Sequence, residues 1–248
     1  MRKFLREVFS RLIQSILSKF GLALIRKTDA RNRSTMRSAI AGIAERNHRF
    51  DTVVDIGASN GSWSEFAMSH FPPCSYLLIE AQDVHEPGLK ALCARHTNAE
   101  YALCAAGEFV GQLYFDIGDP LGGRASTVPH ATNNAMLPAT TVDEEIQNRG
   151  LQGPFLLKFD THGFELPILK GAAKTLLNTE VIVMECYNYK ISEECLLFFE
   201  MCAHLKLHGF RCIDLVEPLY RPYDHTFWQM DIVFVRDTRP SFQYVSYD

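Results

Sequence analysis

Hydrophobic and polar positions change their spacing in blocks along most of the chain. Short runs rich in β-branched and aromatic residues predict strands, and longer stretches with apolar positions three or four apart predict helices. The predicted strands are residues 52–56, 76–80, 101–104, 112–116, 155–160, 181–185, 211–215 and 231–235. The predicted helices are residues 35–46, 62–69, 87–95, 165–177 and 192–208, and residues 118–140 are predicted to be a loop.

This order of elements predicts an α/β fold. Strands that alternate with helices form right-handed βαβ units and a parallel sheet covered on both faces. The strands at 211–215 and 231–235 have no helix between them, so we expect an antiparallel hairpin at one edge. The expectation is a Rossmann-like, doubly wound, seven-stranded sheet in one domain, residues 35–248.

The first 34 residues differ from this domain in pattern and charge. Apolar residues such as Phe4, Val8 and Leu12 fall on one helical stripe opposite basic and polar residues, which predicts an amphipathic helix. Residues 1–37 hold ten Lys or Arg residues against two acidic residues, a net charge of +8. The remaining chain therefore has a net charge of −12, since the total is −4. The helix either packs on its own domain or a second copy, or lies on an anionic membrane surface. Charges interrupt the stripe, which excludes a signal peptide and a membrane span.

The composition indicates in which cellular compartment the protein works and which classes of partner it binds. The chain has seven cysteines, an odd number with no CxxC pair, and most lie in apolar segments. This favours a reducing compartment and argues against zinc. We expect a cytoplasmic protein, free or at the inner face of a membrane. The acidic body would repel phosphates, so we expect no nucleic-acid partner.

The stretch VVDIGASNGSW, residues 53–63, places a glycine turn directly after the first strand. The turn lacks the third glycine of a dinucleotide fingerprint, and an acid, Asp55, stands before its first glycine. An acid there suits a ligand with an amino group, and S-adenosylmethionine is such a ligand. Gly57 and Gly61 would let the backbone approach it, and Glu80 would accept its ribose hydroxyls. The other expected cofactor-binding residues are Ala58, Ser59, Asn60 and Ala105.

Five segments together resemble the FkbM-type family of S-adenosylmethionine-dependent methyltransferases. They are VVDIGASNGSWS, LLIEA, TTVDEEI, LLKFDTHGFELPILKGA and WQMDIVFV, and the resemblance covers about residues 50–236. It implies the class I methyltransferase fold and O-methylation of sugars, polyketides or similar hydroxylated compounds. The family usually has Asp-x-Glu-Gly where this chain has Asp160, Thr161, His162 and Gly163, so the family's role at position 162 does not carry over.

Methyl transfer to a hydroxyl needs alignment of the two reactants and a base for the departing proton. The candidate catalytic residues are Asp160 and Glu185, which end two strands, and His162, whose ordinary pKa lies near neutrality. Their spacing is not diagnostic of a metal site, so we expect none, although the three side chains have the chemistry to converge on one. Glu165 and Asp143 are interpreted as helix-terminal acids.

Two loops are candidates for covering the acceptor. Residues 122–134 contain Arg124 and His130, and residues 220–228 concentrate aromatic rings suited to stacking on a sugar. We expect the acceptor to be a hydroxyl of a glycan or another small molecule.

The sequence has three rival functional interpretations. A nicotinamide-dependent oxidoreductase is disfavoured by the missing glycine. A nucleic-acid methylase is disfavoured because no Asn/Asp-Pro-Pro-aromatic segment follows the fourth strand. The third interpretation, a catalytically inactive protein that binds a partner, stays open.

Overall fold

The computed structural model describes Ile13, Leu17, Lys19 and residues 34–247. The predicted amphipathic N-terminal helix, and with it the domain boundary at residue 34, falls outside the described residues. Within the described part, no helix combines the length and the apolar character that crossing a bilayer requires.

Seven strands form the main sheet, in the order β10-β11-β9-β8-β1-β2-β3. The pairs from β9 through β8, β1 and β2 to β3 are parallel, and β11 is antiparallel to both β9 and β10. The predicted mostly parallel sheet with an antiparallel edge hairpin is therefore confirmed. The strands are β1 (Thr52–Ile56), β2 (Ser75–Glu80), β3 (Ala99–Leu103), β8 (Phe155–Phe159), β9 (Thr179–Tyr187), β10 (Phe210–Tyr220) and β11 (Phe227–Arg236).

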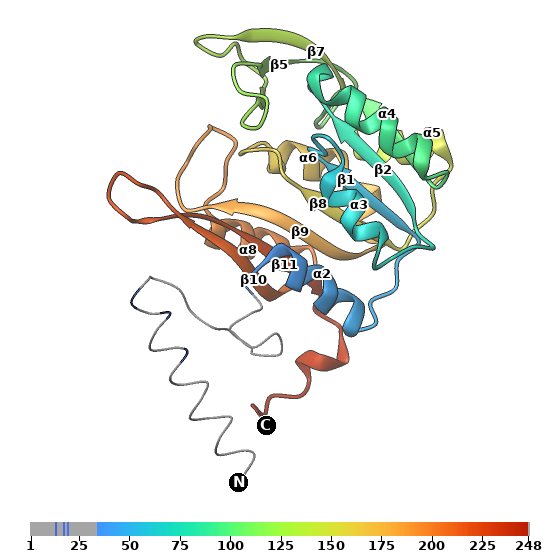
Figure 1. Ribbon diagram of the computed structural model, residues 1–248, viewed down its shortest axis with the longest axis vertical. Coiled ribbons are helices and arrows are strands. Elements are labelled where there is room, and N and C mark those ends of the chain that lie inside the picture. The colour runs from blue at the N-terminus through green and yellow to red at the C-terminus, as the bar shows by residue number, and fades with distance from the viewer. Residues whose placement is uncertain (1–12, 14–16, 18, 20–33, 248) are drawn as a thin grey trace.

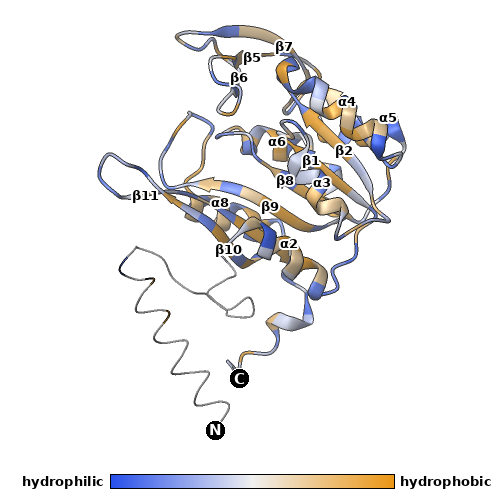
Figure 2. Ribbon diagram, viewed as in Figure 1, coloured by the Kyte–Doolittle hydropathy of each residue, from blue (hydrophilic) through white to orange (hydrophobic). Residues whose placement is uncertain are grey.

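Helices cover both faces of this sheet, which explains its nearly continuous apolar strands. Successive side chains of a strand point to opposite faces, and accordingly Val53 and Val54 lie in two different hydrophobic cores. Figure 2 shows the central strands in the colours of hydrophobic residues. The Val53 core includes α2 (Met36–Glu45), α3 (Ser62–Met68) and α4 (Glu86–Arg95). The Val54 core includes α5 (Val142–Arg149), α6 (Glu165–Gly171), α7 (Ala173–Leu177) and α8 (Phe198–Leu207).

A second, four-stranded sheet has the order β4-β7-β5-β6 (Figure 1, top). Its strands are β4 (Ala105–Ala106), β5 (Gly111–Asp116), β6 (Arg124–Ser126) and β7 (Asn134–Thr140). The prediction of a loop over residues 118–140 was therefore wrong for residues 124–126 and 134–140. Glycine, proline and asparagine give this segment little strand character of its own, and pairing with β5, such as Leu113 with Leu137, makes it extended.

Two predicted helices differ from the observed ones. The helix expected over residues 165–177 divides at Ala172 into α6 and α7. The helix expected over residues 192–208 begins only at Phe198. Ser192 instead donates its hydroxyl to the carbonyl of Gly163, 2.8 Å away, and accepts the Cys195 amide. Residues 192–197 thereby bind the loop after β8 and are not free to continue the helix.

Candidate active site

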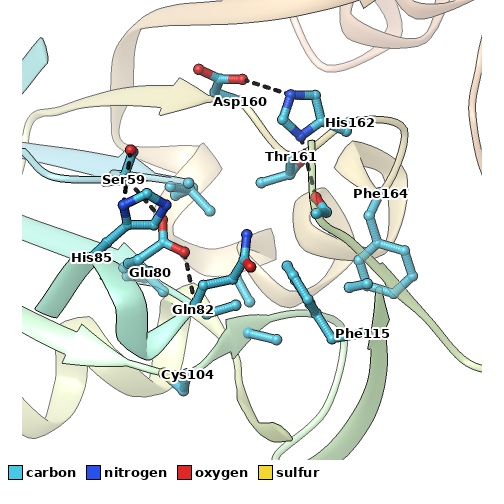
Figure 3. A pocket seen from close by; sticks show the side chains of 18 of the residues that line it. Ser59, Glu80, Gln82, His85, Cys104, Phe115, Asp160, Thr161, His162 and Phe164 are labelled. Atoms are coloured by element: carbon cyan, nitrogen blue, oxygen red, sulfur yellow. Dashed lines mark hydrogen bonds and ion pairs between the residues drawn. The ribbon is translucent and has the colours of Figure 1, made fainter. Parts of the chain in front are cut away.

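A cavity lies at the carboxyl ends of β1, β2 and β8, beside the second sheet. The strand order reverses at β1, and ligands of such sheets bind at that point. About 680 Å³ of space lies between the lining atoms, the open mouth included. Figure 3 shows Ser59, Glu80 and His85 on one side of it and Thr161, His162 and Phe164 on the other. Further lining residues include Ile56, Gly57, Gln82, Cys104, Ala105, Phe115, Pro120, Leu121, Gly123 and Asp160.

The two glycines of the turn are required by packing as well as by conformation. Gly57 has φ +75°, and a Cβ there would lie 1.9 Å from the carbonyl oxygen of Asp160. Only glycine lets the ends of β1 and β8 approach this closely. Gly61 has φ +84°, and its Cβ would lie 2.8 Å from Leu92 Cδ1. Gly57 lines the cavity, whereas Gly61 faces the core of α3 and α4.

The other turn residues divide in the same way. Ser59 lines the cavity, with φ +48°. Ala58 is buried in the core, and Asn60 accepts the Ser62 amide at 3.1 Å, which holds the start of α3. Ala58, Asn60 and Gly61 are not among the residues that line the cavity, so their expected contact with the cofactor stays a prediction.

Glu80 is positioned as expected for a ribose-binding acid. Its side chain ends β2, is buried, and lines the cavity. One carboxylate oxygen accepts the Ser59 amide at 2.7 Å, and the other accepts the Gln82 amide at 2.8 Å. A carboxylate oxygen has two lone pairs, so each keeps one for a ligand hydroxyl. Ala105, also expected at the site, lines the same cavity.

Asp55 takes a different place from the one expected. Its carboxylate is fully buried beneath the turn, 2.9 Å from Lys158 Nζ, and accepts the Ser64 hydroxyl at 2.7 Å. Asp55 is not among the residues that line the cavity. Burial lowers the pKa of Lys158, but the carboxylates of Asp55 and Asp160 outweigh it and raise that pKa, so the ammonium stays charged. The expected direct contact between Asp55 and the cofactor is thus replaced by an ion pair that supports the turn.

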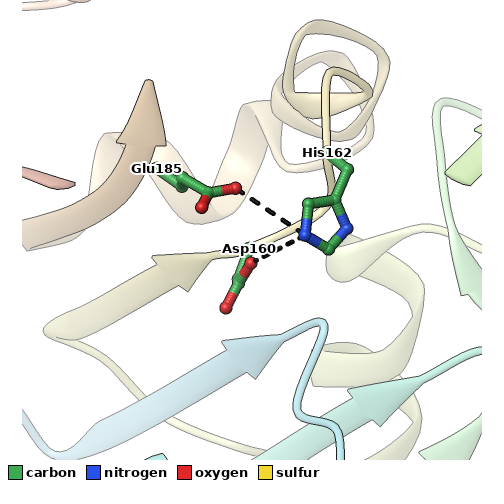
Figure 4. Close-up of side chains that lie close together, drawn as sticks. All are labelled: Asp160, His162 and Glu185. Atoms are coloured by element: carbon green, nitrogen blue, oxygen red, sulfur yellow. Dashed lines mark ion pairs between the residues drawn. The ribbon is translucent and has the colours of Figure 1, made fainter. Parts of the chain in front are cut away.

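The three candidate catalytic residues converge. Nε2 of His162 lies 3.6 Å from Asp160 Oδ1 and 3.8 Å from Glu185 Oε2. Figure 4 shows both carboxylates facing the same ring nitrogen. The other nitrogen, Nδ1, lies 3.2 Å from the carbonyl oxygen of Gly123. Because a carbonyl only accepts, Nδ1 carries the proton in the neutral ring, and the lone pair of Nε2 faces the carboxylates.

Glu185 is held firmly by its neighbours on the sheet. Tyr187 donates to one of its oxygens and Gln229 to the other. Asp231 lies opposite Glu185 in the pairing of β9 with β11. Burial, and then the charge of Asp160, raises the pKa of Glu185 to about 8. Burial and the charge of Glu185 raise the pKa of Asp231 to about 8.

The two acids interpreted as helix-terminal, Glu165 and Asp143, differ in their contacts. Glu165 is buried and accepts the Gly163 amide at 2.9 Å and the Thr161 hydroxyl at 3.1 Å. Asp143 accepts the Lys174 amide at 2.9 Å and the Thr175 amide at 2.8 Å, so it caps α7. Asp143 therefore stabilises the start of α7, whereas Glu165 holds the loop between β8 and α6.

The two expected covering loops contribute differently. From the first, Gly123 lines the cavity, whereas Arg124 donates to the Ile191 carbonyl at 2.6 Å. The second is the turn of the β10–β11 hairpin, because β10 ends at Tyr220 and β11 begins at Phe227. Its Trp228 ring stacks on Tyr189, with centroids 5.0 Å apart, and meets Tyr187 edge-on at 6.4 Å.

The contacts made by the residues after Glu80 were not predicted from the sequence. Gln82 donates its amide to the Pro120 carbonyl at 3.0 Å, and His85 Nε2 lies 2.7 Å from the same oxygen. These contacts hold the loop after β5 over the cavity. Gln82 and His85 could have been found from the sequence, because they are polar residues that closely follow the strand ending at Glu80. The loop after β5 is far from Glu80 in the sequence, and nothing in its sequence predicts these contacts.

Comparison with known proteins identifies the family. No curated protein matches the chain. Among solved structures, an FkbM methyltransferase of Methylobacillus flagellatus aligns with 73% of this chain and 43% of its own, with 19% identity and a TM-score of 0.49. This chain thus spans less than half of that protein. Precorrin-6y C5,15-methyltransferase of Geobacter metallireducens aligns with 87% of this chain and 94% of its own (12% identity, TM-score 0.43).

The fibrillarin of Aeropyrum pernix, crystallised with bound S-adenosyl-L-methionine, aligns with 75% of this chain and 66% of its own (13% identity, TM-score 0.43). The profile of the methyltransferase FkbM domain matches residues 55–212, from Asp55 through the cavity to β10. That match covers more than half of the sequence. The chain belongs to the FkbM methyltransferase family, whose methyl donor is S-adenosylmethionine.

Proposed function

We propose that this protein transfers the methyl group of S-adenosylmethionine to a hydroxyl of a glycan or another small molecule. The observation that carries the proposal is one cavity with two different ends. A buried carboxylate, Glu80, stands at one end, and Asp160 and His162 stand at the other. A donor at the first end and an acceptor hydroxyl at the second would be held side by side, which is the main requirement of methyl transfer.

The residues present fit the cofactor. Glu80 keeps acceptor capacity for the ribose hydroxyls, and Gly57 and Ser59 line the cavity. Ala105 and Phe115 line it with apolar surface suited to the adenine ring. The bound cofactor supplies a methyl group on a sulfonium, already a good leaving group.

In this proposal the cluster of Asp160, His162 and Glu185 removes the proton of the hydroxyl. The Nε2 lone pair of His162 is the base, because the Gly123 carbonyl holds the proton on Nδ1. The carboxylates of Asp160 and Glu185, within 4 Å of Nε2, stabilise the ring once it is protonated.

Aromatic rings beside Glu185 support a ring-shaped acceptor. Tyr187 donates to Glu185 and packs edge-on against Trp228, which stacks on Tyr189. Sugar rings bind proteins through such aromatic faces combined with polar groups. The negative charge of residues 38–248 disfavours a nucleic-acid acceptor. A cytoplasmic location, with the basic N-terminal segment against a membrane surface or a second copy, is part of the same proposal.

The experiment is methyl transfer to a panel of hydroxylated sugars and small aromatic alcohols, followed by mass spectrometry of the product. The His162→Asn variant should lose at least about tenfold in turnover and keep its cofactor affinity, because asparagine tolerates the φ of +53° at this position. The exposed Asp83, at the start of the 3₁₀ helix η2 (Asp83–His85), provides the control variant Asp83→Asn. Methylation of nitrogen alone, or equal turnover in all three proteins, would contradict the proposal. No transfer despite cofactor binding would favour the partner-binding rival.

A further inference from the structure

The cluster of Asp160, His162 and Glu185 has the composition of a metal site. One ligand atom from each side chain lies within 4.8 Å of the other two (Figure 4). We propose that these three residues bind a divalent cation of the first transition row, such as Mn²⁺.

The contacts of His162 favour a ligand role. Nε2 is 3.6 and 3.8 Å from the two carboxylate oxygens, too far for a hydrogen bond to either. The Gly123 carbonyl accepts the proton of Nδ1 and so fixes both the tautomer and the direction of the ring. Histidines that bind metals are usually held in this way by a carbonyl or carboxylate at the second nitrogen.

Each carboxylate is likewise held from outside the cluster. Lys158 lies 3.3 Å from Oδ2 of Asp160, which leaves Oδ1, the atom facing His162, for a cation. Tyr187 and Gln229 donate to Glu185. These supporting residues stand on β8, β9 and β11, within the main sheet, so the ligands are carried by a rigid frame.

The charge balance points the same way. Lys158 is shared between Asp55 and Asp160. Among the described residues, no Lys or Arg lies within ion-pair distance of Glu185 or of its cross-strand neighbour Asp231. A bound cation would favour the ionised forms of these two acids, which otherwise lie beside one another in a largely buried place.

The ligand set and the distances limit the choice of ion. Ligands at about 2.1 Å in an octahedron stand roughly 3 Å apart, so the three side chains would close by about 1 Å. Imidazole together with two carboxylates suits Mn²⁺, Fe²⁺ or Co²⁺ better than Ca²⁺ or Mg²⁺, which prefer oxygen alone.

The consequence for catalysis rests on the proposed function. Three protein ligands leave coordination positions open, and an acceptor hydroxyl bound there would lose its proton at lower pH. His162 would then act as a ligand of the cation and would no longer be the base.

The test is a titration of the full-length protein, freed of metal by chelation, with Mn²⁺, following the loss of the free-ion signal by electron paramagnetic resonance. We expect one saturable site per chain, with binding at least about tenfold weaker in His162→Asn and in Glu185→Gln. The Asp83→Asn control should bind within about twofold of the wild type. No saturable binding at millimolar Mn²⁺, or equal binding in all four proteins, would overturn the inference.

Calorimetry with S-adenosylmethionine on the same metal-free protein separates this inference from the proposed function. Cofactor binding without a Mn²⁺ site would reject the metal and leave the function in place. Mn²⁺ binding that depends on His162 and Glu185, without cofactor binding, would support the metal site and reject the proposed function.

Discussion

The ammonium of Lys158 lies 2.9 Å from Oδ1 of Asp55, beneath the turn that follows β1. The same ammonium donates to the carbonyl of Gly57 at 2.7 Å and lies 3.3 Å from Oδ2 of Asp160. One buried cation thus connects the ends of β1 and β8 with the turn that forms a wall of the cavity. Asp55 is thus connected to the wall of the cavity through the ammonium of Lys158.

We therefore predict that Asp55→Ala mainly destabilises the fold. The change leaves Lys158 buried with only the half-exposed Asp160 as its ionic partner, and breaking a buried pair in this way costs about 3–5 kcal/mol. Urea denaturation measures the free energy of unfolding. The double variant Asp55→Leu/Lys158→Met, which removes both charges, should recover a large part of the loss. A loss below about 1 kcal/mol in Asp55→Ala would show that the ion pair is not what supports the turn.

A second prediction compares two glycines with similar backbone angles. Gly57 (φ +75°) would place a Cβ 1.9 Å from the Asp160 carbonyl, whereas Gly150 (φ +62°) has nothing within 4 Å. Gly150→Ala should cost about 1–2 kcal/mol, the usual strain of the left-handed region. Gly57→Ala should cost clearly more, because β8 must also move. Thermal and urea unfolding of both variants provide the comparison, and equal costs would contradict the packing role of Gly57.

These positions show how far the sequence predicts the molecule. The β1 strand has the predicted bounds because β-branched residues followed by a glycine turn are a local signal. The positions of Glu80 and Ala105 at the cavity could be predicted, because both residues lie at or just after strand ends that meet at one edge. The partner of Asp55 could not be predicted, since Lys158 lies far along the chain on a neighbouring strand. Strands β6 and β7 depend in the same way on pairing with β5.

A third prediction concerns the pH dependence of stability at His48. This histidine is buried, and burial followed by the charges of Arg239 and Arg46 lowers its pKa to about 4 from 6.5. Between about pH 6.5 and 4 the unfolded chain binds a proton that the folded chain does not. Stability is therefore present above pH 6.5 and falls as the pH is lowered towards 4, by up to about 3 kcal/mol.

The measurement is the unfolding free energy at several pH values, for the wild type and for His48→Gln. The difference between the two proteins isolates His48 from the carboxylates that titrate in the same range. The wild type should lose more stability than the variant between pH 7 and 4. Parallel curves would mean that His48 is protonated in the folded state as easily as in the unfolded chain.

A fourth prediction addresses the acceptor side and rests on the proposed function. Trp228→Leu removes the ring that stacks on Tyr189 and meets Tyr187. We expect KM for a sugar or aromatic acceptor to rise about tenfold, in line with the loss of one aromatic contact, while the cofactor affinity stays unchanged. The matched control is Phe199→Leu, because Phe199 is an exposed aromatic residue of α8 whose ring pairs with Phe198 and not with Tyr187 or Tyr189. An unchanged KM in Trp228→Leu would place the acceptor elsewhere.

The most direct measurement is a calorimetric titration of the purified wild type, Glu80→Gln and Asp83→Asn with S-adenosylmethionine, with NADH as a second ligand. Each hydrogen bond to a charged group contributes about 1.5–3 kcal/mol, so Glu80→Gln should weaken cofactor binding by about 10- to 100-fold. Asp83→Asn should bind like the wild type, and NADH should not bind. Equal affinity of all three proteins, or binding of NADH alone, would contradict the assignment of the cavity to the methyl donor.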